Sequence, residues 1–195
     1  MKRYVILVFA FALAACAAPA APDQNAPAPS GAAQNVAAAQ PASLPDLGPA
    51  PDLKGDVWLN TPKPLSPADL RGKVVLVDMW TFECINCQHI LPSVRSWYQK
   101  YNSQGLVVIG NHFPEFQYEA DLGNLKQAIK DQDIPFVVVQ DNQGVNWQAF
   151  NTHAWPSLYL IDKQGHIRYT HIGEGAYSET EGAIQTLLQE PAQKS

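Results

Sequence analysis

The chain has 195 residues, 46% of them hydrophobic and 16% charged, a length that suits one ordinary domain with its own core. Thirteen basic and 18 acidic residues give a net charge of −5, which argues against a nucleic-acid or anionic-lipid binder held by overall charge. Three cysteines are too few for a disulfide-scaffold miniprotein or a four-cysteine zinc site, and their odd number leaves one outside any pair.

The first sixteen residues have the pattern of an export signal. A basic start at Lys2 and Arg3 precedes an eleven-residue apolar run over 4–14, too short for a transmembrane helix of about 20 residues. The run ends in Leu-Ala-Ala-Cys16, which resembles a bacterial lipobox. We therefore predict a lipoprotein signal peptide at 1–15 and acylation of Cys16. A plain secretory signal is the alternative. Cleavage leaves 11 basic and 18 acidic residues, a net charge of −7.

Residues 17–51 have the composition of a tether. They contain 13 Ala and 8 Pro in 35 positions and no aromatic residue, so they cannot bury enough surface to fold alone. We predict that 16–51 are the lipidated Cys and an Ala/Pro-rich tether, and that 52–195 are a globular domain. Ala17 after the lipidated Cys, by resemblance to sorting in enteric bacteria, favours the outer membrane.

Beyond residue 52, apolar strand patterns alternate with helical ones. Continuous Val-rich runs predict buried strands, and Asp162–Gly165 has the chemistry of a hairpin turn. The expected strands are 73–80, 106–110, 136–139, 157–161 and 166–169, with a turn at 69–72 and helical spacing over 90–101, 122–129 and 183–188. This order predicts an α/β domain, and the hairpin makes its sheet mixed.

Cys84 and Cys87 form a C-x-x-C pair between a buried strand and a helix. The amide groups and dipole of a helix N-terminus stabilise a thiolate, which predicts Cys84 as the attacking thiolate and Cys87 as the resolving thiol. A structural disulfide is the alternative, although so short a loop gains little chain entropy. With His89 the pair also suits a copper carrier, whereas a zinc site lacks further ligands. We expect no metal and no cofactor.

The segment Val77–Cys87, Val-Asp-Met-Trp-Thr-Phe-Glu-Cys-Ile-Asn-Cys, resembles the active-site segment of the thioredoxin superfamily. Within it the chain resembles the TlpA/ResA-like extracytoplasmic thiol–disulfide oxidoreductases, and most closely the thioredoxin-like domain of DipZ-type proteins. The resemblance implies a thioredoxin-like fold, a central mixed β-sheet flanked by helices, with an N-terminal strand or hairpin extension. It continues through Pro92, Gly110–Glu115, Trp155-Pro156-Ser157 and Gly173-Glu174-Gly175.

The matching residues take expected roles from this family. Asp78, on an apolar strand, would have a raised pKa and exchange a proton with the buried cysteine; a solvent-facing strand end is the alternative. Trp80 would pack beneath the site or simply fill the core. Pro156, if cis, would present backbone edges to a bound chain, with Trp155 touching substrate. Glu115 would lie near the redox pair. Packing for Trp155 and plain surface charge for Glu115 are the alternatives.

The chain departs from the family pattern next to the cysteines. Glu83 replaces the aromatic residue before the first cysteine, and its charge would raise the pKa of Cys84. The pair between the cysteines is Ile-Asn, and Ile90 replaces a Glu found in ResA-like proteins. The redox potential is therefore not carried over from the family.

These observations predict a lipid-anchored periplasmic thiol–disulfide oxidoreductase acting on exported protein thiols, with reduction favoured over oxidation by resemblance. Electrons would come from a separate DsbD/CcdA-type membrane carrier, and apocytochrome c thiols are candidate acceptors. The alternatives are a peroxiredoxin-like peroxidase, a copper-binding thiol chaperone and an inert tethered binding module. No nucleic-acid partner is expected.

Overall fold

The computed structural model describes residues 43–191, so Cys16, the signal peptide and most of the tether lie outside the described residues. Strands form a single six-stranded sheet within this range. The strands are β1 (Trp58–Leu59), β2 (Val74–Trp80), β3 (Leu106–His112), β4 (Val137–Gln140), β5 (Ser157–Ile161) and β6 (Ile167–Ile172). The helices are α1 (Pro67–Leu70), α2 (Ile85–Tyr101), α3 (Leu122–Asp131), α4 (Val145–Ala149) and α5 (Tyr177–Gln189), with short 3₁₀ turns η1 (Asn102–Gln104) and η2 (Gln117–Ala120).

The sheet is mixed, as predicted. Its strand order is β1-β4-β3-β2-β5-β6, with β2, β3 and β4 parallel and β1, β5 and β6 antiparallel to their neighbours. Parallel neighbours need a crossover, and the helices α2 and α3 supply the two crossovers. All seven residues of β2 are buried, because helices cover both faces of the sheet.

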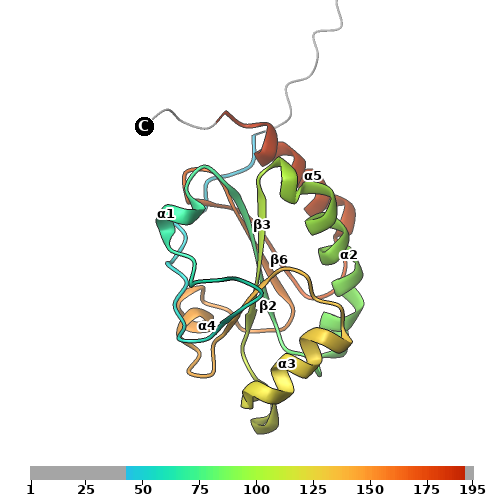
Figure 1. Ribbon diagram of the computed structural model, residues 1–195. Helices are drawn as coiled ribbons and strands as arrows, with labels where there is room; N and C mark the ends of the chain where they lie inside the picture. The colour runs from blue at the N-terminus through green and yellow to red at the C-terminus, as the bar shows by residue number, and fades with distance from the viewer. Residues whose placement is uncertain (1–42, 192–195) are drawn as a thin grey trace, which may run out of the picture. The chain divides into compact units, whose positions relative to one another are not determined.

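Two apolar clusters lie on opposite faces of this sheet. Helices α2, α3 and α5 cover one face, while α1 and α4 lie on the other (Figure 1). Alternation along β2 sends Leu76 and Trp80 into the first cluster and Val77 and Met79 into the second. Asp78 belongs to the same alternate set as Leu76 and Trp80, so it projects from the face that α2 covers.

Two short helices, α1 and α4, were not expected from the sequence, whereas the N-terminal strand that the resemblance implied is present. Strand β1 pairs with β4 at one edge of the sheet and supplies the N-terminal strand extension; α4 precedes β5. Helix α1 occupies the first half of the expected turn at 69–72. Ser66 and Asp69 form a reciprocal capping box around it, and Pro67 takes the first helical position.

The N-terminal residues of the described range pack onto strand β6. Leu47 donates its amide to the carbonyl of Ile167 at 2.8 Å, and Ile167 donates back to Gly48 at 2.8 Å. Leu44 joins the first apolar cluster and Ala50 the second. Residues assigned to the end of the tether therefore pack as part of the folded domain. Among residues 43–191, no helix has the length and apolar character needed to cross a membrane.

Candidate active site

Strand β2 delivers the chain directly to the cysteine pair. The strand ends at Trp80, and Cys84 is the N-cap of α2, four residues later. Cys84 and Cys87 form a disulfide, with their Cα atoms 5.2 Å apart. The amide of Cys87 points at the Sγ atom of Cys84, 3.2 Å away. The first turn of a 17-residue helix thus presents its free N–H groups to the sulfur, which favours a thiolate there.

The two sulfurs differ in exposure. Cys84 is half-buried, whereas Cys87 is 5% exposed and belongs to the core cluster under α2. Ile85, between them, is 60% exposed. Cys84 is therefore the cysteine that is more open to another protein, as the predicted order of attack and resolution requires.

Asp78 lies in the interior rather than at a solvent-facing strand end. Its residue exposure is 3%, and burial raises the pKa of its carboxyl group to about 7. Its Oδ1 atom has no hydrogen-bond partner among the described residues. A carboxyl group with this pKa exchanges protons near neutral pH. Its predicted role toward Cys87 stays a prediction.

Trp80 packs across the neighbouring strand at a glycine. A Cβ added at Gly110 would lie 2.7 Å from the Nε1 atom of Trp80 and 3.3 Å from Phe136, so only glycine leaves room for the indole. The indole also meets the ring of His112 edge to face at 5.3 Å. Trp80 belongs to the same core cluster as Cys87. Filling the core and packing beneath the redox site are therefore compatible roles for this side chain.

The Trp155–Pro156 peptide bond is cis. Met79 pairs with Ser157, which brings Pro156 alongside the end of β2, near the start of the redox loop. Trp155 is half-buried and stacks on Phe113 at 5.8 Å, while its Nε1 donates to the Phe113 carbonyl at 3.1 Å. The indole also packs against the ring of Trp147, with centroids 4.5 Å apart, and contact with a substrate stays a prediction.

The side chains of Glu83 and Glu115 are exposed, but their backbone amides share one partner. That partner is Glu119, which is 0% exposed and was not identified from the sequence. Its Oε1 accepts from the Glu83 amide at 3.1 Å, and its Oε2 accepts from the amides of Glu115 and Phe116 at 2.7 Å each. One buried carboxylate therefore ties the redox loop to the segment before η2.

Thr81 and His112 complete this buried cluster. The Thr81 hydroxyl donates to Glu119, and its oxygen lies 3.2 Å from Nε2 of His112. Because the hydroxyl has a single hydrogen, Nε2 is the donor in that contact and His112 is neutral with its proton on Nε2. Burial lowers the pKa of His112 to about 4, against an opposing effect of Glu119. The His112 ring stacks on Phe82 at 5.4 Å.

Comparison with known proteins agrees with this geometry. A family model described as "AhpC/TSA family" matches residues 48–170, well over half of the chain. The chain belongs to the AhpC/TSA family. The thioredoxin-like fold is shared with a crystal structure of a thioredoxin-like superfamily protein, with a TM-score of 0.70, 31% identity, and coverage of 75% of this chain and 99% of that one.

Two relatives of this AhpC/TSA member are informative. Protein DipZ of Mycobacterium tuberculosis is 45% identical over 150 residues, which is 75% of this chain and 22% of DipZ. The thiol-disulfide oxidoreductase YkuV of Bacillus subtilis is 28% identical over 144 residues, 73% of this chain and 95% of YkuV. The resemblance stated from the sequence is therefore confirmed, and so is the class of enzyme, a thioredoxin-like thiol–disulfide oxidoreductase. The chain spans about a fifth of the DipZ length.

The structure of this AhpC/TSA chain brings most of the predicted site residues to one end of β2. Asp78 and Trp80 lie in β2, Cys84 and Cys87 follow it, and Pro156 precedes the paired strand β5. Cys16 lies outside the described residues. Nothing in the sequence around Glu119 distinguished it from a surface acid, since its burial depends on a tertiary contact with Thr81.

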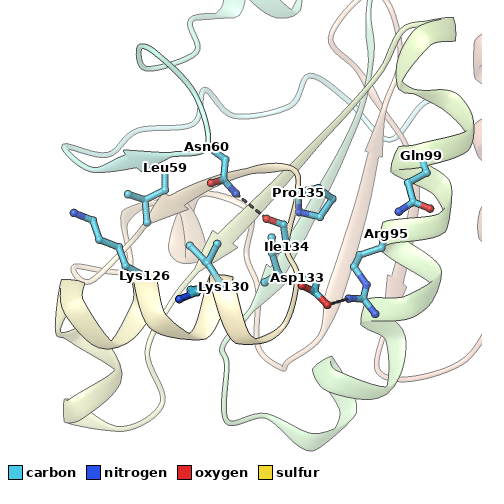
Figure 2. A pocket seen from close by; sticks show the side chains of 10 residues that line it. Leu59, Asn60, Arg95, Gln99, Lys126, Lys130, Asp133, Ile134 and Pro135 are labelled. Carbon is cyan, nitrogen blue, oxygen red and sulfur yellow. Dashed lines mark hydrogen bonds and ion pairs between the residues drawn. The ribbon is translucent and has the colours of Figure 1, made fainter.

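A separate pocket of about 900 Å³ lies away from the disulfide, between α2 and α3 (Figure 2). Three cations line it, Arg95, Lys126 and Lys130, and Arg95 pairs with Asp133 at 3.6 Å. None of the predicted site residues lines this pocket. The AhpC/TSA redox site thus sits apart from this basic hollow.

Proposed function

We propose that this chain is a lipid-anchored periplasmic reductase of disulfides in exported proteins. The observation that carries the proposal is the Cys84–Cys87 pair at the N-terminus of α2, with Cys84 accessible and Cys87 buried. A disulfide placed to staple a fold would gain nothing from one open sulfur, whereas an exchange reaction requires it.

The reaction follows from this asymmetry. The Cys84 thiolate attacks one sulfur of a substrate disulfide, so that a mixed disulfide forms and a first substrate thiolate leaves. Cys87 then loses its proton, for which the Asp78 carboxylate is the proposed acceptor, and attacks the Sγ of Cys84. The second substrate thiolate leaves, two electrons have passed to the substrate, and Cys84–Cys87 is oxidised. A membrane dithiol carrier of the DsbD/CcdA type would reduce it again.

The N-terminal sequence supports the proposed location. A basic start, a short apolar run and Leu-Ala-Ala-Cys16 are what a lipoprotein signal requires, and the Ala/Pro-rich residues after it would let the domain reach exported partners. The outer membrane is slightly favoured by Ala17. We expect the full chain to sediment with membranes and Cys16→Ser to be released in the periplasmic fraction. Equal release of the unaltered chain and of Cys16→Ser would contradict a lipid anchor at Cys16.

The reduction potential of the pair tests the direction of electron flow. A value near that of thioredoxin, about −270 mV, is expected for a reductase, whereas a value near about −120 mV, as in DsbA, would exclude it. Cys84→Ser should abolish insulin reduction, and Cys87→Ser should accumulate a mixed disulfide with substrate because the resolving thiol is missing.

A peroxiredoxin-like peroxidase is the second candidate, since an accessible thiolate at a helix N-terminus also reacts with small oxidants. The Cys87→Ser variant separates the two. Sustained consumption of hydrogen peroxide by this variant with an external thiol would favour the peroxidase, and we expect none above the rate of a free thiol.

A further inference from the structure

Exposed apolar side chains gather beside the redox disulfide. Seven large hydrophobic side chains are exposed within residues 43–191, and four of them border this site. Ile85 is 60% exposed, Phe116 and Tyr118 are 49% exposed each, and Ile172 is 61% exposed. The rings of Phe116 and Tyr118 stack in parallel, with centroids 5.9 Å apart. Such a concentration of exposed apolar surface marks a site of contact with another molecule.

Three contacts hold these side chains near Cys84. Glu119 binds the amides of both Glu83 and Phe116, so the aromatic pair sits next to the redox loop. On strand β6, Ile172 pairs with Ser157 of β5, and Ser157 directly follows the cis-proline Pro156. His89, in the first turns of α2, contacts Glu174 at 3.0 Å and fixes the loop after Ile172 against that helix.

The same surface carries only negative formal charge. The four segments around the disulfide, 80–91, 112–121, 153–157 and 172–176, contain four exposed carboxylates, the buried Glu119 and no Lys or Arg. The pKa of the Tyr118 hydroxyl is raised, first by loss of hydration and then by the negative charges of Glu83, Glu119 and Glu115. Three of these carboxylates therefore act electrostatically on one side chain. Among residues 43–191, Lys126 and Lys130 lie in the separate pocket (Figure 2), and Arg95, which borders this surface at Gln88 and Leu91, pairs with Asp133 at 3.6 Å.

We propose that the surface around Cys84 selects unfolded polypeptide segments in which a cysteine is flanked by Lys or Arg and by aromatic or aliphatic side chains. This inference rests on the proposed function and names the class of its substrate. The apolar side chains cover those of the incoming segment, and Glu83 and Glu115 attract its cations and repel acidic segments. Folded substrates keep their apolar side chains inside, so the preference is for unfolded chains.

The test uses two oxidised peptides with one disulfide and the same aromatic residues, one rich in Lys and the other in Glu. Their second-order rate constants with the reduced full chain are measured by stopped-flow fluorescence. We expect the Lys peptide to react about tenfold faster at low ionic strength. The ratio of the two rates should fall toward one as salt is added, because salt screens exposed charges. A variant that changes the intrinsic reactivity of Cys84 changes both rate constants by the same factor, so the ratio of the Lys peptide to the Glu peptide is unaffected.

The double variant Glu83→Gln/Glu115→Gln should bring this ratio close to one, whereas Glu179→Gln, an exposed carboxylate on α5, should leave it unchanged. Phe116→Ala with Tyr118→Ala should slow both peptides and spare a small neutral disulfide, hydroxyethyl disulfide. Equal rates for the two peptides in the unaltered chain, or an unchanged ratio in the double variant, would overturn the inference alone. Failure to reduce hydroxyethyl disulfide as well would overturn the proposed function.

Discussion

Asp78 and His112 are buried side chains whose pKa values move in opposite directions. For Asp78, about 7 in the fold against 3.8, the folded state holds a proton that the unfolded chain has lost, so stability falls as pH rises through that range. For His112, about 4 against 6.5, the unfolded chain binds the extra proton, so stability rises with pH. The two effects oppose each other between about pH 4 and about pH 6.5.

Removing Asp78 should therefore expose the effect of His112. We expect the oxidised Asp78→Asn variant to gain about 2 kcal/mol of unfolding free energy between about pH 4.5 and about pH 6, while the unaltered chain changes much less. Urea denaturation at both pH values measures this. Asp131→Asn, at an exposed position of α3, is the control and should follow the unaltered chain. Identical pH dependence in all three proteins would refute the opposed titrations.

Glu83 acts on the neighbouring sulfur through charge. Glu83→Gln removes a negative charge beside Cys84, so the pKa of that thiol should fall. The reduction potential of the cysteine pair should become less negative, because removal of the charge stabilises the thiolate of the reduced protein relative to the disulfide. The pH dependence of alkylation by iodoacetamide reports the thiol pKa, with Glu179→Gln as the control for net charge. An unchanged or raised pKa would count against this effect.

At the scale of elements, Glu119 joins the redox loop to η2. Glu119→Gln replaces an acceptor of four hydrogen bonds with a group that must donate at one end, which leaves part-buried amides without partners. We expect a loss of about 2–4 kcal/mol in the free energy of unfolding by urea. Glu115→Gln makes the same chemical change on an exposed side chain nearby and should cost less than about 0.5 kcal/mol. Similar losses for both would show that the buried contacts contribute little.

The long elements were predictable because their signals are local. Residues 73–80 read as a doubly buried strand, and the structure has β2 at Val74–Trp80. The cysteine pair was recognisable from its spacing and its place before a helix. Strand β1 has two residues and α4 five, too short for periodicity to register. Glu119 escaped notice for another reason, since its burial is set by residues 38 positions away, at Thr81.

At the scale of the molecule, Arg168 links both ends of the described chain. Its guanidinium donates to the carbonyls of Leu44 and Pro45 and to the carboxylates of Asp162 and Glu190. A chain that begins at residue 52 loses the first two contacts and the pairing of Leu47 with β6. We expect its Tm to lie roughly 5–15 °C below that of a chain beginning at residue 43, measured by circular dichroism. Equal values would place the working boundary at residue 52.

The segment at 47–50 also covers the start of one edge of the sheet. Strand β6 would otherwise offer its outer backbone groups to any passing chain, and an open strand edge is a template for aggregation. Leu47 and Gly48 bind both backbone groups of Ile167, the first residue of β6, and Ala50 binds Gly165 in the turn before it, while the opposite edge, β1, is only two residues long. If the proposed function holds, the protein meets many extended, unfolded chains, and this contact shortens the strand edge to which such chains could add as extra strands.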